Sequence, residues 1–167
     1  NATTDKGLTV TYTAADPTVV SISGNTATIL KAGTTQITAT QAGDATYTAA
    51  DTVKQTLVVN KKELTVTSAV AADKTYDGTT TATISGASLS GIVDTDAVTL
   101  GNSTSGTFAQ ATVGSGIAVG TSMTISGDDA ANYSLTQPSL TAAITTKELT
   151  VTGAKASDKV YDGSTTA

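Results

Sequence analysis

The hexapeptide Lys62-Glu63-Leu64-Thr65-Val66-Thr67 carries both a strand pattern and a repeat. Its apolar side chains alternate with threonines, so an extended chain would bury the first set on one face and leave the second exposed. The same six residues return as Lys147-Glu148-Leu149-Thr150-Val151-Thr152, an offset of 85 residues. An exact recurrence of this kind indicates a repeat unit of this length.

Other pairs of segments share the same offset without a gap. They are Asp73-Lys74 with Asp158-Lys159, Tyr76-Asp77-Gly78 with Tyr161-Asp162-Gly163, and Thr80-Thr81-Ala82 with Thr165-Thr166-Ala167. A period near 85 is too long for a solenoid repeat and fits a small sandwich domain. We expect one complete repeat over residues 62–146, the first part of another over 147–167, and a different domain over 1–61.

Period-two alternation also occurs outside the hexapeptide, at Leu8 to Tyr12, at Val20 and Ile22, and around Ile37. Ser23-Gly24-Asn25-Thr26 separates two such runs and predicts a hairpin with a two-residue turn. Further turns are predicted at Asp77-Gly78, Gly101-Asn102 and Gly127-Asp128. Short strands at spacings of about ten residues predict an all-β fold, with tandem immunoglobulin-like or Greek-key-type β-sandwich domains in a linear array.

The composition supports a folded, charge-poor protein. Threonine makes up roughly a fifth of the 167 residues, and it suits half-exposed strands. Leu, Ile, Val and Phe together also make up only about a fifth, which approaches the range of disordered chains. Disorder usually requires a high net charge as well, whereas the formal charge is −5. We expect a thin core that gains from contacts with neighbouring domains.

Charge and residue types exclude several functions. The acidic balance and nine scattered lysines argue against nucleic acid, which needs clustered basic residues. No apolar run approaches 18 residues, so no membrane insertion is expected. Without His or Cys there is neither an imidazole base nor a thiol nucleophile, so we expect no catalytic residues and no enzyme activity. Glu63 and Glu148 are repeat equivalents at strand starts, which favours a structural role.

The two junctions lack flexible linkers. Neither Leu57 to Leu64 nor Ala143 to Leu149 contains Gly, Pro or Ser. A final strand would then run almost directly into the first strand of the next domain, giving a short, stiff connection and a rod.

Residues 8–60 resemble a bacterial immunoglobulin-like domain of group 2 type. The stretches that carry the resemblance are Leu8 to Thr13, Asp16 to Asn25, and Ala32 to Ala39, and Gly43 to Ala50 fits related variants in adhesin arrays. Such domains usually have a further strand or two before the position of Leu8, so the resemblance implies a domain truncated at its N-terminus.

Residues 62–146 resemble a YDG domain, through Lys74 to Thr80 and through Gly127 to Leu135 with its Asn132-Tyr133 pair. Similar repeats occur in very large bacterial surface proteins, including haemagglutinin-like adhesins. The resemblance implies secretion, an extracellular location on the bacterial cell surface, and a part in adhesion. Two functions are then open, a stalk that holds an adhesive region away from the cell, and a module that itself binds a glycan or a host or microbial protein. The expected partners are neighbouring repeats of the same chain and, for the second function, an unknown extracellular ligand.

The repeated motif has a structural interpretation. Asp77 and Asp162 would bind turn amides, while Gly78 and Gly163 would supply an unusual φ. Tyr76 and Tyr161 would be aromatic anchors near a junction, or else platforms for sugar stacking. The chain has five Tyr, one Phe and no Trp, which favours the anchors.

A structural calcium ion is the one cofactor that the sequence suggests. Asp94 and Asp96 have a D-x-D spacing, and Asp128, Asp129 and Asn132 offer clustered oxygens. An EF-hand loop starting at Asp94 fails because Ser105 stands where its last position needs Glu. A different calcium site between domains, involving Asp73 or Asp128, remains open. Lys74, Asp77 and Asn132 are also, by residue type, candidates for a Lys–Asn isopeptide crosslink.

Overall fold

The computed structural model describes residues 2–165, and its regular structure is almost entirely β-strand. The exception within this range is a 3-10 turn, η1 (Ala130–Asn132). The all-β prediction is therefore confirmed. No helix in the described part is long and apolar enough to cross a membrane. Residue 1 and residues 166 and 167, the outer ends of the predicted first and third segments, lie outside the described residues.

The N-terminal unit has a three-stranded antiparallel sheet with a hairpin packed over it. The sheet order is β1-β4-β5, from β1 (Thr11–Ala14), β4 (Gly33–Thr40) and β5 (Val53–Val59). The hairpin joins β2 (Val20–Ser23) to β3 (Thr26–Ile29), with Ser23 opposite Thr26. The predicted two-residue turn is thus confirmed, and Gly24 in it has a φ of +58°. The predicted strand from Leu8 is wrong in its first part, because β1 begins only at Thr11.

Two facing sheets form the central unit. One has the order β7-β9-β12-β13-β16-β8, and the other has the order β10-β6-β15, with a separate pair β11-β14. The strands are β6 (Lys62–Thr67), β7 (Val70–Ala71), β8 (Lys74–Thr75), β9 (Thr81–Ser85), β10 (Ser88–Ser90), β11 (Thr99–Gly101), β12 (Ser105–Phe108), β13 (Gly114–Gly120), β14 (Thr124–Ser126), β15 (Tyr133–Thr136) and β16 (Leu140–Thr145).

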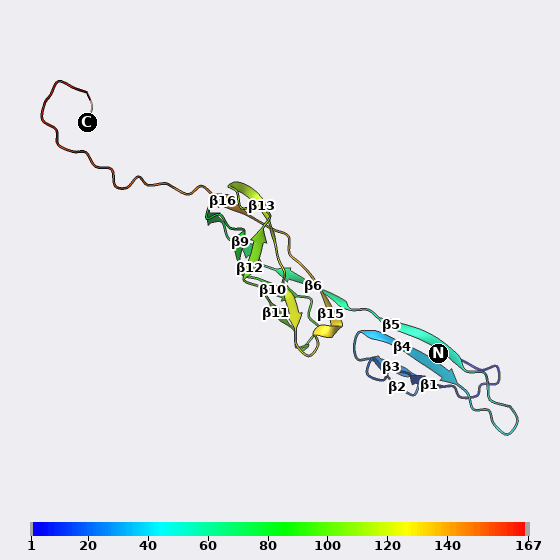
Figure 1. Cartoon of the computed structure of the whole chain (residues 1–167). Helices are drawn as coiled ribbons and strands as arrows, with labels where there is room; N and C mark the ends of the chain where they lie inside the picture. The colour runs from blue at the N-terminus through cyan, green and yellow to red at the C-terminus, as the bar shows by residue number, and fades with distance from the viewer. Residues whose placement is uncertain (1, 166–167) are drawn as a thin grey trace.

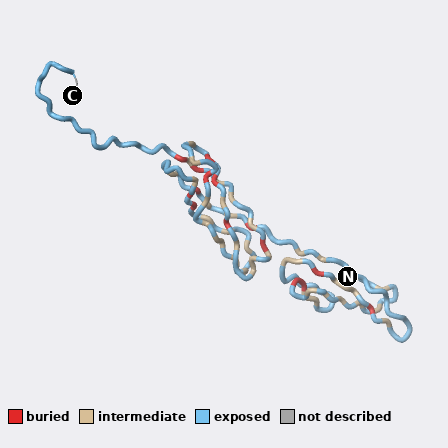
Figure 2. Tube along the Cα trace, viewed as in Figure 1, coloured by how far each residue is buried: buried red, intermediate tan, exposed pale blue. Residues whose placement is uncertain are grey.

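The core of this unit lies between its sheets (Figure 2). Phe108 is its largest member, with 1% of its surface exposed, and Val66 and Leu135 pack against the cluster from the smaller sheet. The buried members are Ala71, Ala82, Ile84, Phe108, Ile117, Val119, Met123, Ala142 and Ile144. Along β9 and β13 they alternate with exposed residues, as the period-two pattern requires.

A corner lets one antiparallel pair of strands contribute to both sheets. β7 pairs with β9 in the larger sheet, and β6 pairs with β10 in the smaller one. Between these pairings the chain turns at Ser68, with a φ of +60°, and at Gly86, with a φ of +72°. A Cβ atom at Gly86 would lie 2.5 Å from the carbonyl oxygen of Ser68, so the two segments meet backbone to backbone.

The first and last segments of the central unit run parallel along its length. β15 pairs in parallel with β6, with Tyr133 opposite Lys62, and β16 pairs in parallel with β8, with Thr145 opposite Thr75. The chain therefore enters the unit at one end and leaves at the other. Figure 1 shows the resulting end-to-end arrangement, with β5 leading into β6 and the chain leaving beyond β16.

The repeated hexapeptide at residues 147–152 forms no strand, and no regular strand occurs from there to residue 165. Leu149 and Val151 are 89% and 92% exposed, whereas their counterpart Leu64 is fully buried. The expectation of a first strand in the third segment is therefore wrong for the chain as given. β6 is held between β10 and β15, and the sequence contains no counterparts of these two strands after residue 152.

We predict that Gly86→Ala destabilises the central unit more than Gly78→Ala does. Both glycines have positive φ, so each alanine costs about 1–2 kcal/mol of backbone strain. Only at Gly86 does the new methyl group also meet a backbone oxygen, because no atom lies within 4 Å of a Cβ at Gly78. Urea unfolding of both variants measures the difference, and equal midpoints would contradict the close approach at the corner.

Candidate functional site

The Tyr-Asp-Gly segment is a turn organised around the ammonium group of Lys74. Lys74 Nζ lies 2.7 Å from Asp77 Oδ1, and it donates to Thr79 O at 3.0 Å, to Thr79 Oγ1 at 2.9 Å and to Thr81 O at 3.2 Å. Asp77 Oδ1 also accepts from the backbone N–H of Thr79 at 2.8 Å and from its hydroxyl at 2.9 Å. Gly78 has a φ of +80°. The predicted roles of Asp77 and Gly78 in the turn therefore agree with this geometry.

This turn lies at the exit end of the central unit. The backbone N–H of Tyr76 donates to Thr145 O at 2.8 Å, next to the parallel pairing of Lys74 with Ile144. Lys74 Nζ also lies 5.9 Å from the centre of the Phe108 ring, which ties the turn to the core. Tyr76 itself is 43% exposed, so its ring lies at the end of the unit without being covered.

The second copy of the motif forms the same turn without a sheet around it. Lys159 Nζ lies 3.1 Å from Asp162 Oδ1 and also binds the hydroxyl of Ser164. Asp162 Oδ1 accepts from Ser164 N at 3.0 Å, and Gly163 has a φ of +74°. Tyr161 is 95% exposed. The turn is therefore specified locally by the spacing of Lys, Asp, Gly and a hydroxyl residue.

Hydrogen bonds stabilise the ionised form of both aspartates. The hydrogen bond from Lys74, followed by those from Thr79, lowers the pKa of Asp77 to about 2. The backbone N–H of Ser164 and then Lys159 lower the pKa of Asp162 below its ordinary value.

The opposite, entry end of the unit is organised around Tyr133, which is 3% exposed. Its hydroxyl donates to Asp96 Oδ2 at 2.5 Å and accepts from Val93 N at 3.0 Å. The bond to Asp96 and burial together raise the pKa of Tyr133. Asp129 caps the same loop, because its Oδ2 accepts from Ala97 N at 2.8 Å.

Asn132 connects this end to the N-terminal unit. Its side-chain oxygen accepts a hydrogen bond from the backbone N–H of Ala32 at 2.9 Å. Ala32 immediately precedes β4, whose first residue, Gly33, lies opposite Val59 at the end of β5. The two units are thus joined by the chain itself and by this bond, with only Asn60 and Lys61 between their strands.

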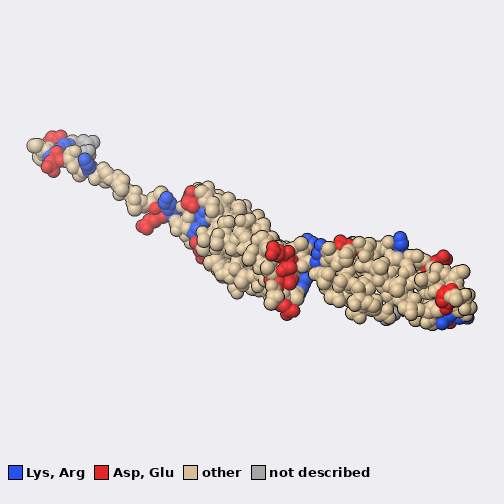
Figure 3. Space-filling model, turned by 90° about the horizontal axis from the view of Figure 1, so that it is seen from below, with Lys and Arg blue, Asp and Glu red and all other residues tan. Residues whose placement is uncertain are grey.

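The calcium candidates do not form a ligand set. Asp96 and Asp129 lie around Tyr133, but their oxygens are engaged by Tyr133 and Ala97, and Asp94 and Asp128 are exposed. Within residues 2–165, no group of three His, Cys, Asp or Glu side chains is placed to hold a metal ion. Figure 3 shows acidic and basic side chains together at the waist between the two units, next to this loop.

The crosslink hypothesis is wrong for a similar reason. Lys74 and Asp77 pair with each other at the exit end, whereas Asn132 binds Ala32 at the entry end. A Lys–Asn bond within one unit would need both side chains at the same place. The sequence analysis assigned Lys74 a role only in a Lys–Asn crosslink and missed its role as the hydrogen-bond donor of the turn. The recurrence of this lysine at Lys159 could have indicated that role.

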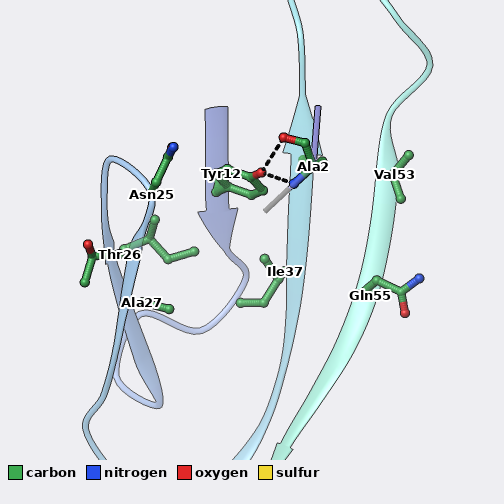
Figure 4. A pocket seen from close by; sticks show the side chains of 10 residues that line it. Ala2, Tyr12, Asn25, Thr26, Ala27, Ile37, Val53 and Gln55 are labelled. Carbon is green, nitrogen blue, oxygen red and sulfur yellow. Dashed lines mark hydrogen bonds between the residues drawn. The ribbon is translucent and has the colours of Figure 1, made fainter. Parts of the chain in front are cut away.

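The cleft in the N-terminal unit is the main alternative site (Figure 4). It has a volume of about 310 Å³ and lies between the β2-β3 hairpin and the sheet, with Ile22 and Ala27 on one side and Ile37 on the other. Tyr12 is its one aromatic side chain, and its hydroxyl is engaged by the backbone of Ala2.

These features define an all-β protein whose central unit carries one motif at each end. Residues 60–142 match the YDG domain family, so this part of the chain is a YDG domain. The match begins two residues before the predicted boundary at Lys62 and covers both motifs, from the Tyr76 turn to the Tyr133 loop. No curated protein and no solved structure matches the chain.

We predict that Asp77→Asn removes a pH-dependent part of the stability. A folded-state pKa of about 2, below the ordinary value of about 3.9, means that ionised Asp77 stabilises the fold above about pH 5. This contribution is lost as the pH falls toward 2. The difference in unfolding free energy between wild type and variant should therefore be largest near neutral pH and shrink toward pH 2. Asp162→Asn is the matched control and should change nothing, because its turn packs on no sheet; a constant difference across the pH range would contradict the Lys74 pairing.

We also predict that Tyr133→Phe destabilises the YDG domain by about 1–3 kcal/mol, because it removes the hydroxyl of a buried side chain that donates to the Asp96 carboxylate and accepts from the N–H of Val93. Tyr76→Phe should be close to neutral, since Tyr76 is exposed. Denaturant unfolding of both variants gives the comparison, and equal stabilities would show that the hydroxyl of Tyr133 contributes nothing.

Proposed function

We propose that the chain is a stalk segment of a large secreted or cell-surface bacterial adhesin, made of a group 2-type immunoglobulin-like domain followed by YDG repeats. Its work is mechanical, since it holds an adhesive region away from the cell. The proposed location is extracellular, and its partners are neighbouring repeats of the same chain. That the chain is not an enzyme and binds no nucleic acid stays a prediction from composition.

The observation that carries this proposal is the parallel course of the first and last segments of the YDG domain. With β15 beside β6 and β16 beside β8, entry and exit lie at opposite ends. An antiparallel final strand would instead return the chain to its starting end and stack the domains side by side. Each added domain therefore lengthens the array.

The short junction supports the same function. Two residues, Asn60 and Lys61, connect β5 to β6, and the bond between Ala32 and Asn132 gives the units a second point of attachment. A connection of this length without Gly or Ser restricts bending. Stiffness is what a spacer needs in order to keep its reach.

Direct adhesion is the alternative function, and the cleft beside Tyr12 is where a ligand would bind. Its lining is mainly apolar, with Ile22, Ile37 and Val53 among its side chains. The single aromatic ring and its engaged hydroxyl disfavour a glycan, because sugars usually stack on several aromatic rings. An apolar segment of a protein fits this lining better.

We predict an extended particle for residues 1–146 in small-angle scattering. Two sandwiches end to end should give a radius of gyration of about 22 Å from strand lengths, against ~15 Å for one compact globule of this size. The value should be the same in calcium and in chelator, because the described residues offer no metal ligand set. A Gly-Ser insertion between Asn60 and Lys61 is the control and should give a flexible profile. A compact wild-type value would overturn the stalk, and a calcium-dependent value would restore a junctional ion.

A further inference from the structure

The exit end of the YDG domain shares one strand pairing with the exit end of the N-terminal unit, although the register of β13 shifts just after it, between Gly114 and Ile117. In the N-terminal unit, Gly33 lies opposite Val59 in the pairing of β4 with the last strand. In the YDG domain, Gly114 lies opposite Ile144 in the pairing of β13 with the last strand. Ala32 and Val113 immediately precede these two glycines, so they occupy equivalent positions.

The spacing to the following repeat is also identical. Val59 stands three residues before Lys62, and Ile144 stands three residues before Lys147, where the repeated hexapeptide begins. A domain that starts at Lys147 would therefore be connected to the YDG domain by the same length of chain that connects the domain starting at Lys62 to the N-terminal unit. The connection would also begin at the equivalent position of the last strand.

One donor and two apolar side chains lie uncovered at this exit end. Within residues 2–165, the backbone N–H of Val113 has no hydrogen-bond acceptor, whereas the equivalent N–H of Ala32 donates to Asn132. Val113 is 48% exposed and Tyr76 is 43% exposed. They flank the exit strand from its two sides, since the sheet order there is β13-β16-β8 and Tyr76 N binds Thr145 O.

From this equivalence we infer that successive YDG repeats bind head to tail, the N–H of Val113 in one repeat donating to the side-chain oxygen of the Asn132 counterpart in the next. Val113 and Tyr76 are covered in the same contact. This interface would repeat the one between the N-terminal unit and the YDG domain, where Ala32 binds Asn132. Each of the two motifs would then lie on one side of it. The Tyr-Asp-Gly turn belongs to the repeat that precedes, and the Asn-Tyr loop to the repeat that follows. This inference rests on the proposed stalk and specifies how its repeats are held.

The test is a chain in which a second copy of residues 62–146 follows Thr146. The sequence has no Cys, so Thr83→Cys in each copy places one spin label on the exposed face of β9 in each repeat. Electron paramagnetic resonance then measures the distribution of distances between the two repeats. We expect a single narrow peak for this parent protein.

Two pairs of matched variants locate the contact. Val113→Glu in the first copy places a carboxylate in the interface and should broaden the distribution, whereas the same change in the second copy, which no repeat follows, should leave the peak narrow. Asn132→Ala in the second copy should broaden it, and Asn132→Ala in the first copy should not. Each pair has the same composition and the same risk of misfolding, so only the interface differs.

The outcomes separate this contact from the stalk itself. Narrow peaks in all variants would overturn the head-to-tail contact and leave the stiff stalk standing. A broad peak in the parent protein would overturn both, because it would show that the repeats move freely. Equal broadening by Val113→Glu in the first copy and in the second copy would assign the effect to the fold of the repeat and overturn the contact.

Discussion

The passage from β5 to β6 through only Asn60 and Lys61 determines how the two units are arranged. A reversal over two residues would pair β6 with β5 as a hairpin, whereas β6 pairs with β10 and β15 instead. The YDG domain must therefore begin where the N-terminal unit ends, with Lys62 at its entry. The loop around Tyr133 lies at that entry because β15 pairs with β6 in parallel, with Tyr133 opposite Lys62. Asn132 next to it can then reach Ala32. The two units are therefore connected both by the chain and by the hydrogen bond between Ala32 and Asn132.

The polar networks at the two ends compensate for a small core. The buried cluster has nine apolar residues, of which Phe108 is the one aromatic member, and so small a cluster leaves little surface to offset the conformational entropy of the domain. The ends of a sandwich are where its sheets are least covered. At the exit end, Lys74 gathers three carbonyl or hydroxyl oxygens and one carboxylate and still lies over Phe108. At the entry end, Tyr133 binds one acceptor and one donor across the loop that holds Asp96. The Tyr-Asp-Gly turn and the Asn-Tyr loop thus each stabilise one end of the sandwich.

The sequence was sufficient wherever a structure is determined by neighbours along the chain. Alternation predicted β6, and Gly24-Asn25 predicted the hairpin, because side-chain period and turn preference are local properties. Parallel pairing, the corner at Ser68 and Gly86, and the bond from Ala32 to Asn132 were missed, because each joins residues that sequence pattern does not relate.

The repeat itself shows the difference. Residues 62–67 and 147–152 are identical, yet only the first set is a strand, because it alone has β10 and β15 beside it. The Lys159 turn forms like the Lys74 turn, since the contacts that join Lys159, Asp162 and Ser164 lie within six residues.

This contrast has a consequence for how an array of such repeats is built. The turn at the exit of a repeat needs no partner, whereas the entry strand needs residues that follow it by about 70 positions, as Leu64 needs Leu135. Long-range parallel pairing of this kind forms slowly, because the chain loses the entropy of loop closure before any contact between the strands can stabilise the pair. The last strand along the chain, β16, is also the one that positions the exit beside Tyr76 and Val113. A repeat therefore presents a finished end face only once its own fold is complete, and the next repeat has a defined surface to join only from that moment.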